Sequence, residues 1–245
     1  MKLAEVFTQL TYGELSQLNI GGAEAGAIDD TNYAKILPHV NLGLAALYKR
    51  FNLKENRLVI ELIEDKVTYP LLKRFAVNGG GAEPVRYIMD TLSEPYLEDI
   101  NKVERVYLDS GSELGLNDDS DIYGCFTPSY NILRIPAILV NDGVVPEELM
   151  TASLEVVYRA NHPLLVYDAD FNPNSIELEL PYSHLEPLLL FIASRINNPI
   201  GMTNEFHAGN SYAAKYEQAC ILLEQKNLQV DVGSQGDRFS SKGWV

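Results

Sequence analysis

The spacing of apolar residues changes twice along the chain, and this change limits the folds that the sequence can adopt. Near both ends of the chain, apolar residues recur every three or four positions, as on one face of a helix. In the middle of the chain they recur at every second position, as in strands. A chain of 245 residues with this order of elements is long enough to bury its own core. We therefore expect an α+β fold, in which the N- and C-terminal helices form a bundle, an antiparallel β module is inserted between them in the sequence, and an extended C-terminal tail follows.

The helices are expected within residues 2–51 and 182–228. Pro38 lies inside the second apolar stripe and marks a kink or a helix start near that point. Pro181 stands at a suitable first position for the helix that follows it. The predicted buried faces consist of Leu3, Val6, Phe7, Leu10, Tyr33, Ile36, Leu37, Val40, Leu44, Leu47, Tyr48, Phe51, Leu185, Leu188, Leu189, Ile192, Ile196, Phe206, Ala213, Tyr216, Cys220 and Leu223.

The β module is expected at residues 54–180, so that residues 1–229 form one domain. Apolar residues alternate on both sides of Asp65, which predicts a hairpin that turns there. Further strands, some joined by polar turns, are predicted within residues 103–118, 123–136, 154–163 and 175–181.

The charge balance argues against a protein that grips nucleic acid. The chain has 34 acidic and 19 basic side chains and a net charge of −15, whereas binding to phosphates requires Lys and Arg. This charge suits either solubility alone or a position beside nucleic acid that the protein does not hold. The strongly apolar stretches are too short to cross a bilayer, so we expect no membrane partner.

No motif points to catalysis, to a metal or to a cofactor. The segment "NGGGAEP" lacks the Lys-Ser/Thr of a phosphate loop, and the acidic segment from Asp109 lacks the glycine of a calcium loop at position six. The four histidines show no metal-ligand spacing, and no G-x-S-x-G motif occurs. Cys125 lies in a predicted strand with no histidine near it in sequence. We therefore predict a protein that is not an enzyme.

The C-terminal residues 230–245 are expected to form an extended docking tail. Glycine and serine make this segment too flexible to fold alone, yet it holds two large anchors, Phe239 and Trp244. Five residues of extended chain set the anchors roughly 17 Å apart at ~3.3 Å per residue. Arg238 and Lys242 supply the local positive charge. The alternative, in which this tail folds back on its own bundle, stays open.

Several segments together resemble the head-to-tail adaptor (connector) proteins of tailed bacteriophages. They cover nearly the whole chain and carry packing and turn signatures: "TYGELSQLNIG", "HVNLGLAALYKRF", "RLVIELIEDKVTYPL", "DIYGCFTPSYNILRIP" and "NEFHAGNSYAAKYEQACILLEQKNLQVD". The resemblance implies a helical core with a β extension and a homo-oligomeric ring, commonly twelvefold, in the virion neck. Such a ring assembles in the host cytoplasm and connects the portal to tail tube or nozzle proteins, with DNA passing through its centre.

The resemblance also suggests partners for individual residues. The partner of the tail would be the portal, which the tail would contact through Arg238, Phe239, Lys242, Trp244 and Val245. Candidates for acidic groups that face the DNA channel are Asp118, Asp119 and Asp121, although these residues would also suit an outer loop. Two alternatives remain: another ring protein of the neck or tail tube, or a small-molecule-binding protein or enzyme with a pocket in the β module.

Overall fold

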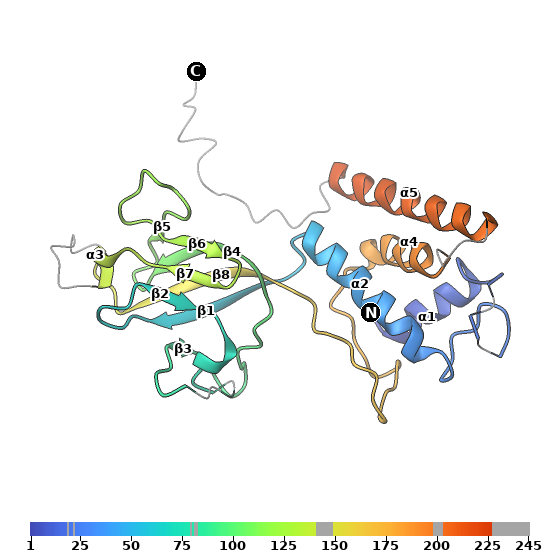
Figure 1. Cartoon of the computed structure of the whole chain (residues 1–245), viewed down its shortest axis with the longest axis horizontal. Coiled ribbons are helices and arrows are strands. Elements are labelled where there is room, and N and C mark those ends of the chain that lie inside the picture. The colour runs from blue at the N-terminus through green and yellow to red at the C-terminus, as the bar shows by residue number, and fades with distance from the viewer. Residues whose placement is uncertain are drawn as a thin grey trace, which may run out of the picture. The chain divides into compact units, whose positions relative to one another are not determined.

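The chain divides into two compact units, which we call the helical unit and the β unit. The helical unit comprises residues 1–53 and those from 162 onward, and the β unit comprises residues 54–161. The computed structural model describes residues 1–18, 20–21, 23–78, 80, 83–140, 149–197 and 203–226, with the backbone alone for residues 140 and 203–208. Helices and two antiparallel sheets occur together in these residues, which confirms the α+β class (Figure 1).

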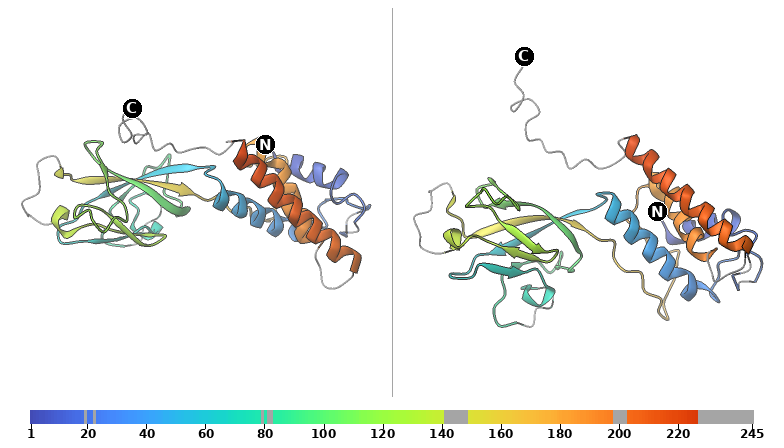
Figure 2. Two further views of the ribbon diagram at one scale, coloured as in Figure 1. Left: turned by 90° about the horizontal axis from the view of Figure 1, so that it is seen from above. Right: turned by 45° about the horizontal axis from the view of Figure 1, so that its top comes forward.

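Four longer helices build the helical unit. They are α1 (Leu3–Tyr12), α2 (Tyr33–Arg50), α4 (Leu185–Ile196) and α5 (Thr203–Gln225), with a short 3-10 helix η3 (Tyr182–His184) before α4. Helix α4 contacts each of the other three, and α5 runs alongside it in both views of Figure 2. The predicted apolar faces of α1, α2 and α4 are largely buried. Helix α2 continues through Pro38.

A glycine sets how closely α2 approaches α4. A Cβ atom placed on Gly43 would lie 2.7 Å from Leu188 Cδ1 and 3.2 Å from Phe191 Cδ1. Leu188 is fully buried and belongs to the core of the helical unit. A side chain at position 43 would therefore push the two helices apart.

Helix α5 carries a narrower buried face than its sequence predicts. Tyr216, Cys220 and Leu223 are buried, but Ala213 is exposed. The Phe206 side chain lies outside the described part of the chain. Arg50 at the end of α2 binds α5 through two carboxylates, with Nη1 2.6 Å from Glu217 Oε2 and Nε 2.6 Å from Glu224 Oε1.

Residues 162–180, which the sequence analysis assigned to the β module, belong to the helical unit. The backbone N–H of Leu3 donates to the Ile176 carbonyl at 3.0 Å, and that of Leu178 donates to the Met1 carbonyl at 2.8 Å. Near the start of the segment, the backbone of Leu165 makes two hydrogen bonds with the side chain of Asn41, at 2.9 and 3.0 Å. The alternating pattern at residues 175–181 thus pairs with the start of the chain.

The β unit contains two sheets. The larger one has the order β3-β1-β8-β4-β5, and the smaller one has the order β2-β7-β6. Their strands are β1 (Glu55–Glu61), β2 (Thr68–Pro70), β3 (Ile88–Met89), β4 (Ile100–Leu108), β5 (Glu113–Leu114), β6 (Phe126–Ser129), β7 (Ile132–Arg134) and β8 (Ser153–Ala160). A 3-10 helix η1 (Lys73–Phe75) and a short helix α3 (Ala137–Val140) complete the unit.

The predicted hairpin around Asp65 is wrong, although both of its strands exist. Asp65 does turn the chain, with φ of 60°. The strand before it, β1, pairs with β3 and β8, whereas the strand after it, β2, pairs with β7 in the other sheet. The two later hairpins, β4–β5 and β6–β7, are confirmed.

The β unit begins and ends on neighbouring strands. Glu55 at the start of β1 lies opposite Arg159 near the end of β8. The unit therefore leaves and rejoins the helical unit at one place, as expected of an insertion. Among the described helices, none has both the length and the apolar character that crossing a bilayer requires.

Candidate functional site

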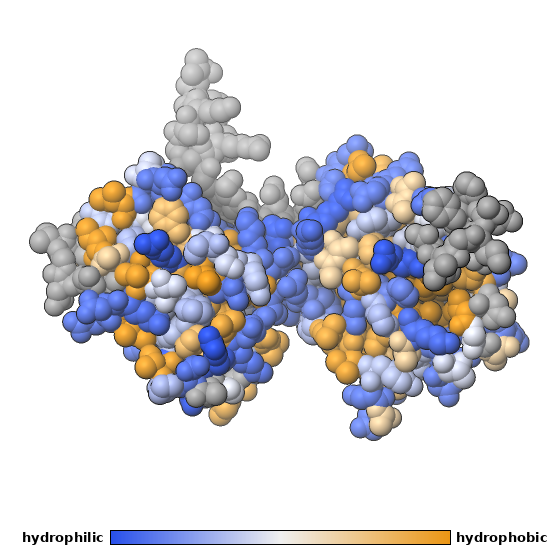
Figure 3. Space-filling model, viewed as in Figure 1, coloured by the Kyte–Doolittle hydropathy of each residue, from blue (hydrophilic) through white to orange (hydrophobic). Residues whose placement is uncertain are grey.

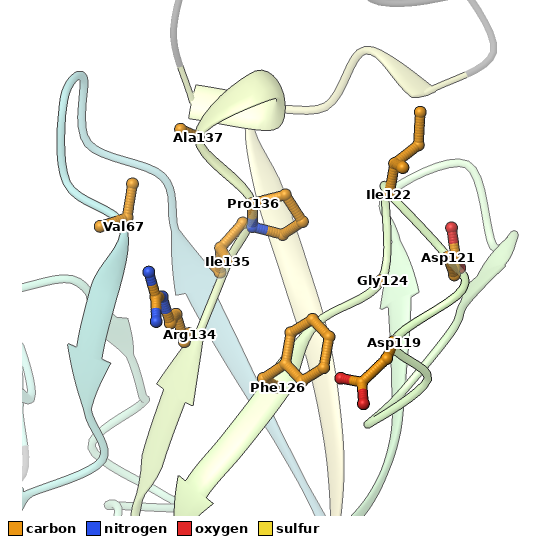
Figure 4. A pocket seen from close by; sticks show the side chains of 10 residues that line it. All are labelled: Val67, Asp119, Asp121, Ile122, Gly124, Phe126, Arg134, Ile135, Pro136 and Ala137. Atoms are coloured by element: carbon orange, nitrogen blue, oxygen red, sulfur yellow. The ribbon is translucent and has the colours of Figure 1, made fainter.

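The β unit carries an open groove between the loop that precedes β6 and the end of β7. Its volume is about 560 Å³. Figure 4 shows the residues that line it: Val67, Asp119, Asp121, Ile122, Gly124, Phe126, Arg134, Ile135, Pro136 and Ala137.

Opposite charges stand on the two sides of this groove. Arg134 lies on one wall, Asp119 and Asp121 lie on the other, and the Phe126 ring lies between them (Figure 4). Ile122 adds an apolar side chain that is 69% exposed. Within the part of the chain that the structure describes, Arg134 makes no ion pair. The groove thus offers a cation, two carboxylates and apolar area.

Hydrogen bonds within the acidic loop hold its shape. Asn117 has a positive φ of 58°; its N–H donates to the Cys125 carbonyl at 2.8 Å, and its side-chain oxygen accepts from the Thr127 N–H at 2.8 Å. Asp118 Oδ1 accepts from both the hydroxyl and the N–H of Ser120, which lowers the pKa of that carboxyl. Asp121 Oδ1 accepts from the Tyr123 N–H at 2.9 Å.

The groove contains no activated nucleophile. Cys125 lies behind it and is fully buried, and burial, together with the nearby Asp121 charge, raises the pKa of the thiol to about 12. Burial also lowers the pKa of His39 and His184, both in the helical unit, which favours their neutral forms. The described residues include no group of three or more His, Cys, Asp or Glu side chains placed to hold a metal ion.

The sequence-predicted site residues have different outcomes. The structure places Asp119 and Asp121 on the groove wall and Asp118 in the same loop. The tail residues Arg238, Phe239, Lys242, Trp244 and Val245 lie outside the described residues. Sequence reasoning missed Arg134, Phe126 and Ile122, although Arg134 is the only cation in the segment 123–136, which was a usable signal.

Exposed apolar side chains also occur elsewhere on both units, interspersed with polar ones (Figure 3). On the helical unit, Leu42, Leu164, Val166 and Tyr167 are each at least 47% exposed. Leu42 belongs to α2, and the other three residues belong to the segment that the Asn41 side chain holds beside α2 through its hydrogen bonds to the Leu165 backbone.

No protein-family model matches the chain, and no curated protein is detectably similar to it in sequence.

Gly115 is expected to be required for the shape of the acidic loop. A Cβ atom at this position would overlap Asp121 Oδ2, so Gly115→Ala must displace the carboxylate from the groove wall. We expect this substitution to lower the free energy of unfolding by about 1–3 kcal/mol, as overpacking does. In an Asp121→Ala background the same substitution should cost clearly less, and denaturation of the parent protein and the three variants measures the difference. Equal costs in both backgrounds would contradict the contact.

Proposed function

We propose that this chain is a head-to-tail adaptor of a tailed bacteriophage. It assembles as a ring on the portal in the virion neck and connects the capsid to the tail around the DNA channel. In this role the protein is a structural component and not an enzyme.

One observation carries the proposal: helices from both ends of the chain share one core, and the β unit is inserted between them. The resemblance implies a helical bundle with a β extension, and this order of elements supports it. A subunit of this kind has two surfaces for head-to-tail contacts, and such contacts close into a ring when the rotation between copies allows it. The charged groove of the β unit suits a contact between neighbouring ring components.

The docking tail has a separate role in the proposal. Phe239 and Trp244 fill two pockets of the portal, while Arg238 and Lys242 meet acidic groups beside them. Aromatic and Arg side chains are enriched where truncation costs ~2 kcal/mol or more. Residues 230–245 are then mobile in the free subunit and become ordered on the portal.

The proposal predicts only weak, non-specific affinity for DNA. With 34 acidic and 19 basic side chains, the subunit repels the phosphate backbone, which lets DNA slide through the ring. Titration of labelled duplex DNA with the purified protein at low salt should give dissociation constants no tighter than about 10⁻⁵ M. A tight complex whose affinity falls steeply with salt would argue against a passive channel.

Light scattering tests the proposed assembly. The protein is measured alone, and then after mixing with the portal protein encoded in the same genome. We expect the mixture to gain the mass of a complete set of adaptor copies on each portal ring. A monomer that ignores the portal and binds a small molecule would instead favour the enzyme or ligand-binding alternative.

A further inference from the structure

The first half of β1 is an open sheet edge. Strand β8 pairs with every residue of β1, whereas β3, on the other side, pairs only with Val59 and Ile60. Residues 55–58 therefore have a strand on one side only. Such an edge is a template on which another extended chain can pair, and proteins generally cover or protect it.

A hydrogen bond at the end of β1 fixes which backbone groups face the open side. The Glu61 N–H donates to the Tyr87 carbonyl on the β3 side at 2.9 Å. Lateral direction alternates along a strand, and the register between β1 and β8 has no shift, so the N–H and C=O of Glu55 and Arg57 also point toward the β3 side. Among the described strands, none pairs with these two residues there.

An open groove of the β unit lies along this edge. Its volume is about 700 Å³, and it is lined by residues 55–59, by residues from the segment 89–99 and by Tyr158. Strand β3 ends at Met89, and the open part of β1 measures roughly 13 Å at ~3.3 Å per residue. The groove therefore provides space for a short extended chain beside β1.

The two faces of the open edge present different side chains. Val59 and Met89 lie opposite each other on one face, where they are 38% and 44% exposed. Asn56 lies on the other face, because successive side chains of a strand alternate, and its amide donates to Asp99 Oδ2 at 3.2 Å. The groove is thus apolar on one face of the sheet and acidic on the other.

Three of the four carboxylates that line the groove have no cation beside them. Asp90, Glu94 and Asp99 take part in none of the ion pairs among the described residues. Hydrogen bonds from neutral groups hold Asp90 and Asp99 in place without neutralising them. The one cation among the lining residues, Arg57, lies 2.7 Å from a Glu155 oxygen. This charge favours a partner with Lys or Arg side chains.

We propose that the open edge of β1 binds an extended segment of a partner protein in which apolar and basic side chains alternate. The segment adds to the sheet beside Glu55 and Arg57 and makes backbone hydrogen bonds to both residues. Its apolar side chains cover Val59 and Met89, and its basic side chains face the acidic side of the groove. The proposal does not depend on the phage function, because the surface is built from the β unit alone.

Short peptides test the proposal on the full-length protein. The probe is a labelled hexapeptide of alternating Lys and Val. One control has the same composition with all Lys before all Val, and the other alternates Glu and Val. By fluorescence anisotropy at physiological salt, we expect the probe to bind at least about 10-fold more tightly than either control. Equal binding of the two basic peptides, or no binding of the probe at about 1 mM, would overturn the proposal.

A proline at residue 57 tests the backbone pairing. Because the Arg57 N–H points away from β8, Arg57→Pro removes a donor on the open edge and keeps the pairing with β8. Arg57→Ala is the matched control, since it removes the same side chain and retains the N–H. We expect the probe to bind at least about fivefold more weakly to Arg57→Pro than to Arg57→Ala. Equal affinities would contradict strand addition at this edge.

Hydrogen exchange of the parent protein gives a second measurement that needs no variant. At a saturating concentration of the probe, we expect the amides of Glu55 and Arg57 to exchange at least about 10-fold more slowly than in the free protein. The amide of Leu58, which faces β8, is the internal control and should not change. Unchanged exchange at Glu55 and Arg57 with the probe bound would place it elsewhere and overturn the proposal.

Discussion

Deleting residues 237–245 is expected to abolish portal binding while leaving the stability of the subunit unchanged. The deletion removes both aromatic anchors and both cations of the proposed docking tail. Loss of two anchors at ~2 kcal/mol each weakens binding by about 4 kcal/mol, or roughly 1,000-fold. Portal affinity and the free energy of unfolding are both measured, and the latter should change by less than about 0.5 kcal/mol.

Single substitutions provide the controls for this deletion. Phe239→Ala and Trp244→Ala should each reproduce a large part of the loss, whereas Ser240→Ala and Ser241→Ala should have little effect. Normal portal binding by the truncated protein would remove the tail from the docking mechanism. A loss of several kcal/mol of stability would instead place Trp244 in the core of its own subunit.

Gly43→Leu is expected to disrupt the helical unit more than any exposed substitution. A Cβ atom alone would already lie 2.7 Å from Leu188 Cδ1, and the remaining leucine atoms have no space between α2 and α4. We expect the free energy of unfolding to fall by about 3 kcal/mol, since overpacking a buried contact forces helices or side chains out of position. Chemical denaturation followed by far-ultraviolet circular dichroism measures this change.

A neighbouring substitution separates overpacking from a general effect on α2. Leu42 lies next to Gly43 but is 47% exposed, so Leu42→Ala should change stability by less than about 1 kcal/mol. Because the β unit has its own core, its tyrosine signals should remain native-like in Gly43→Leu. Equal effects of the two substitutions would contradict the close approach of α2 and α4 at this position.

Apolar periodicity predicts the elements of this chain better than it predicts their partners. Leu58 and Ile60 are buried on one face of β1, as their alternation requires. The same alternation continues after Asp65 at Tyr69, but there it serves a different sheet. Period two identifies which side of a strand is buried, whereas pairing depends on distant residues such as those of β8, which no local pattern specifies.

The segment 162–180 illustrates the same limit at a boundary between units. Its alternating residues looked like part of the β module, yet Leu178 bonds to Met1, and Ile176 bonds to Leu3. The hydrogen-bonding groups of an extended segment can be satisfied by any other extended backbone, here the N-terminus. The boundary between the two units at residue 161 therefore depends on these hydrogen bonds between residues distant in sequence.

The charged groove was accessible to sequence reasoning only in part. The acidic loop stands out as a cluster of Asp residues, and the structure places Asp119 and Asp121 on one wall. Arg134 comes from a strand ten or more residues later and reaches the groove because β7 pairs with both β6 and β2. Because pairing between distant strands brings Arg134 to the groove, no fixed spacing in the sequence predicts its position there.

The most direct test of the proposed function is electron cryo-microscopy of the protein mixed with its portal. We expect a closed ring of adaptor copies, in portal-matched symmetry, seated at one end of the portal around its channel. The C-terminal residues from Arg238 to Val245 should be ordered against the portal surface. The protein is supplied in large excess over the portal. Portals that carry no adaptor copies under these conditions would contradict the adaptor function.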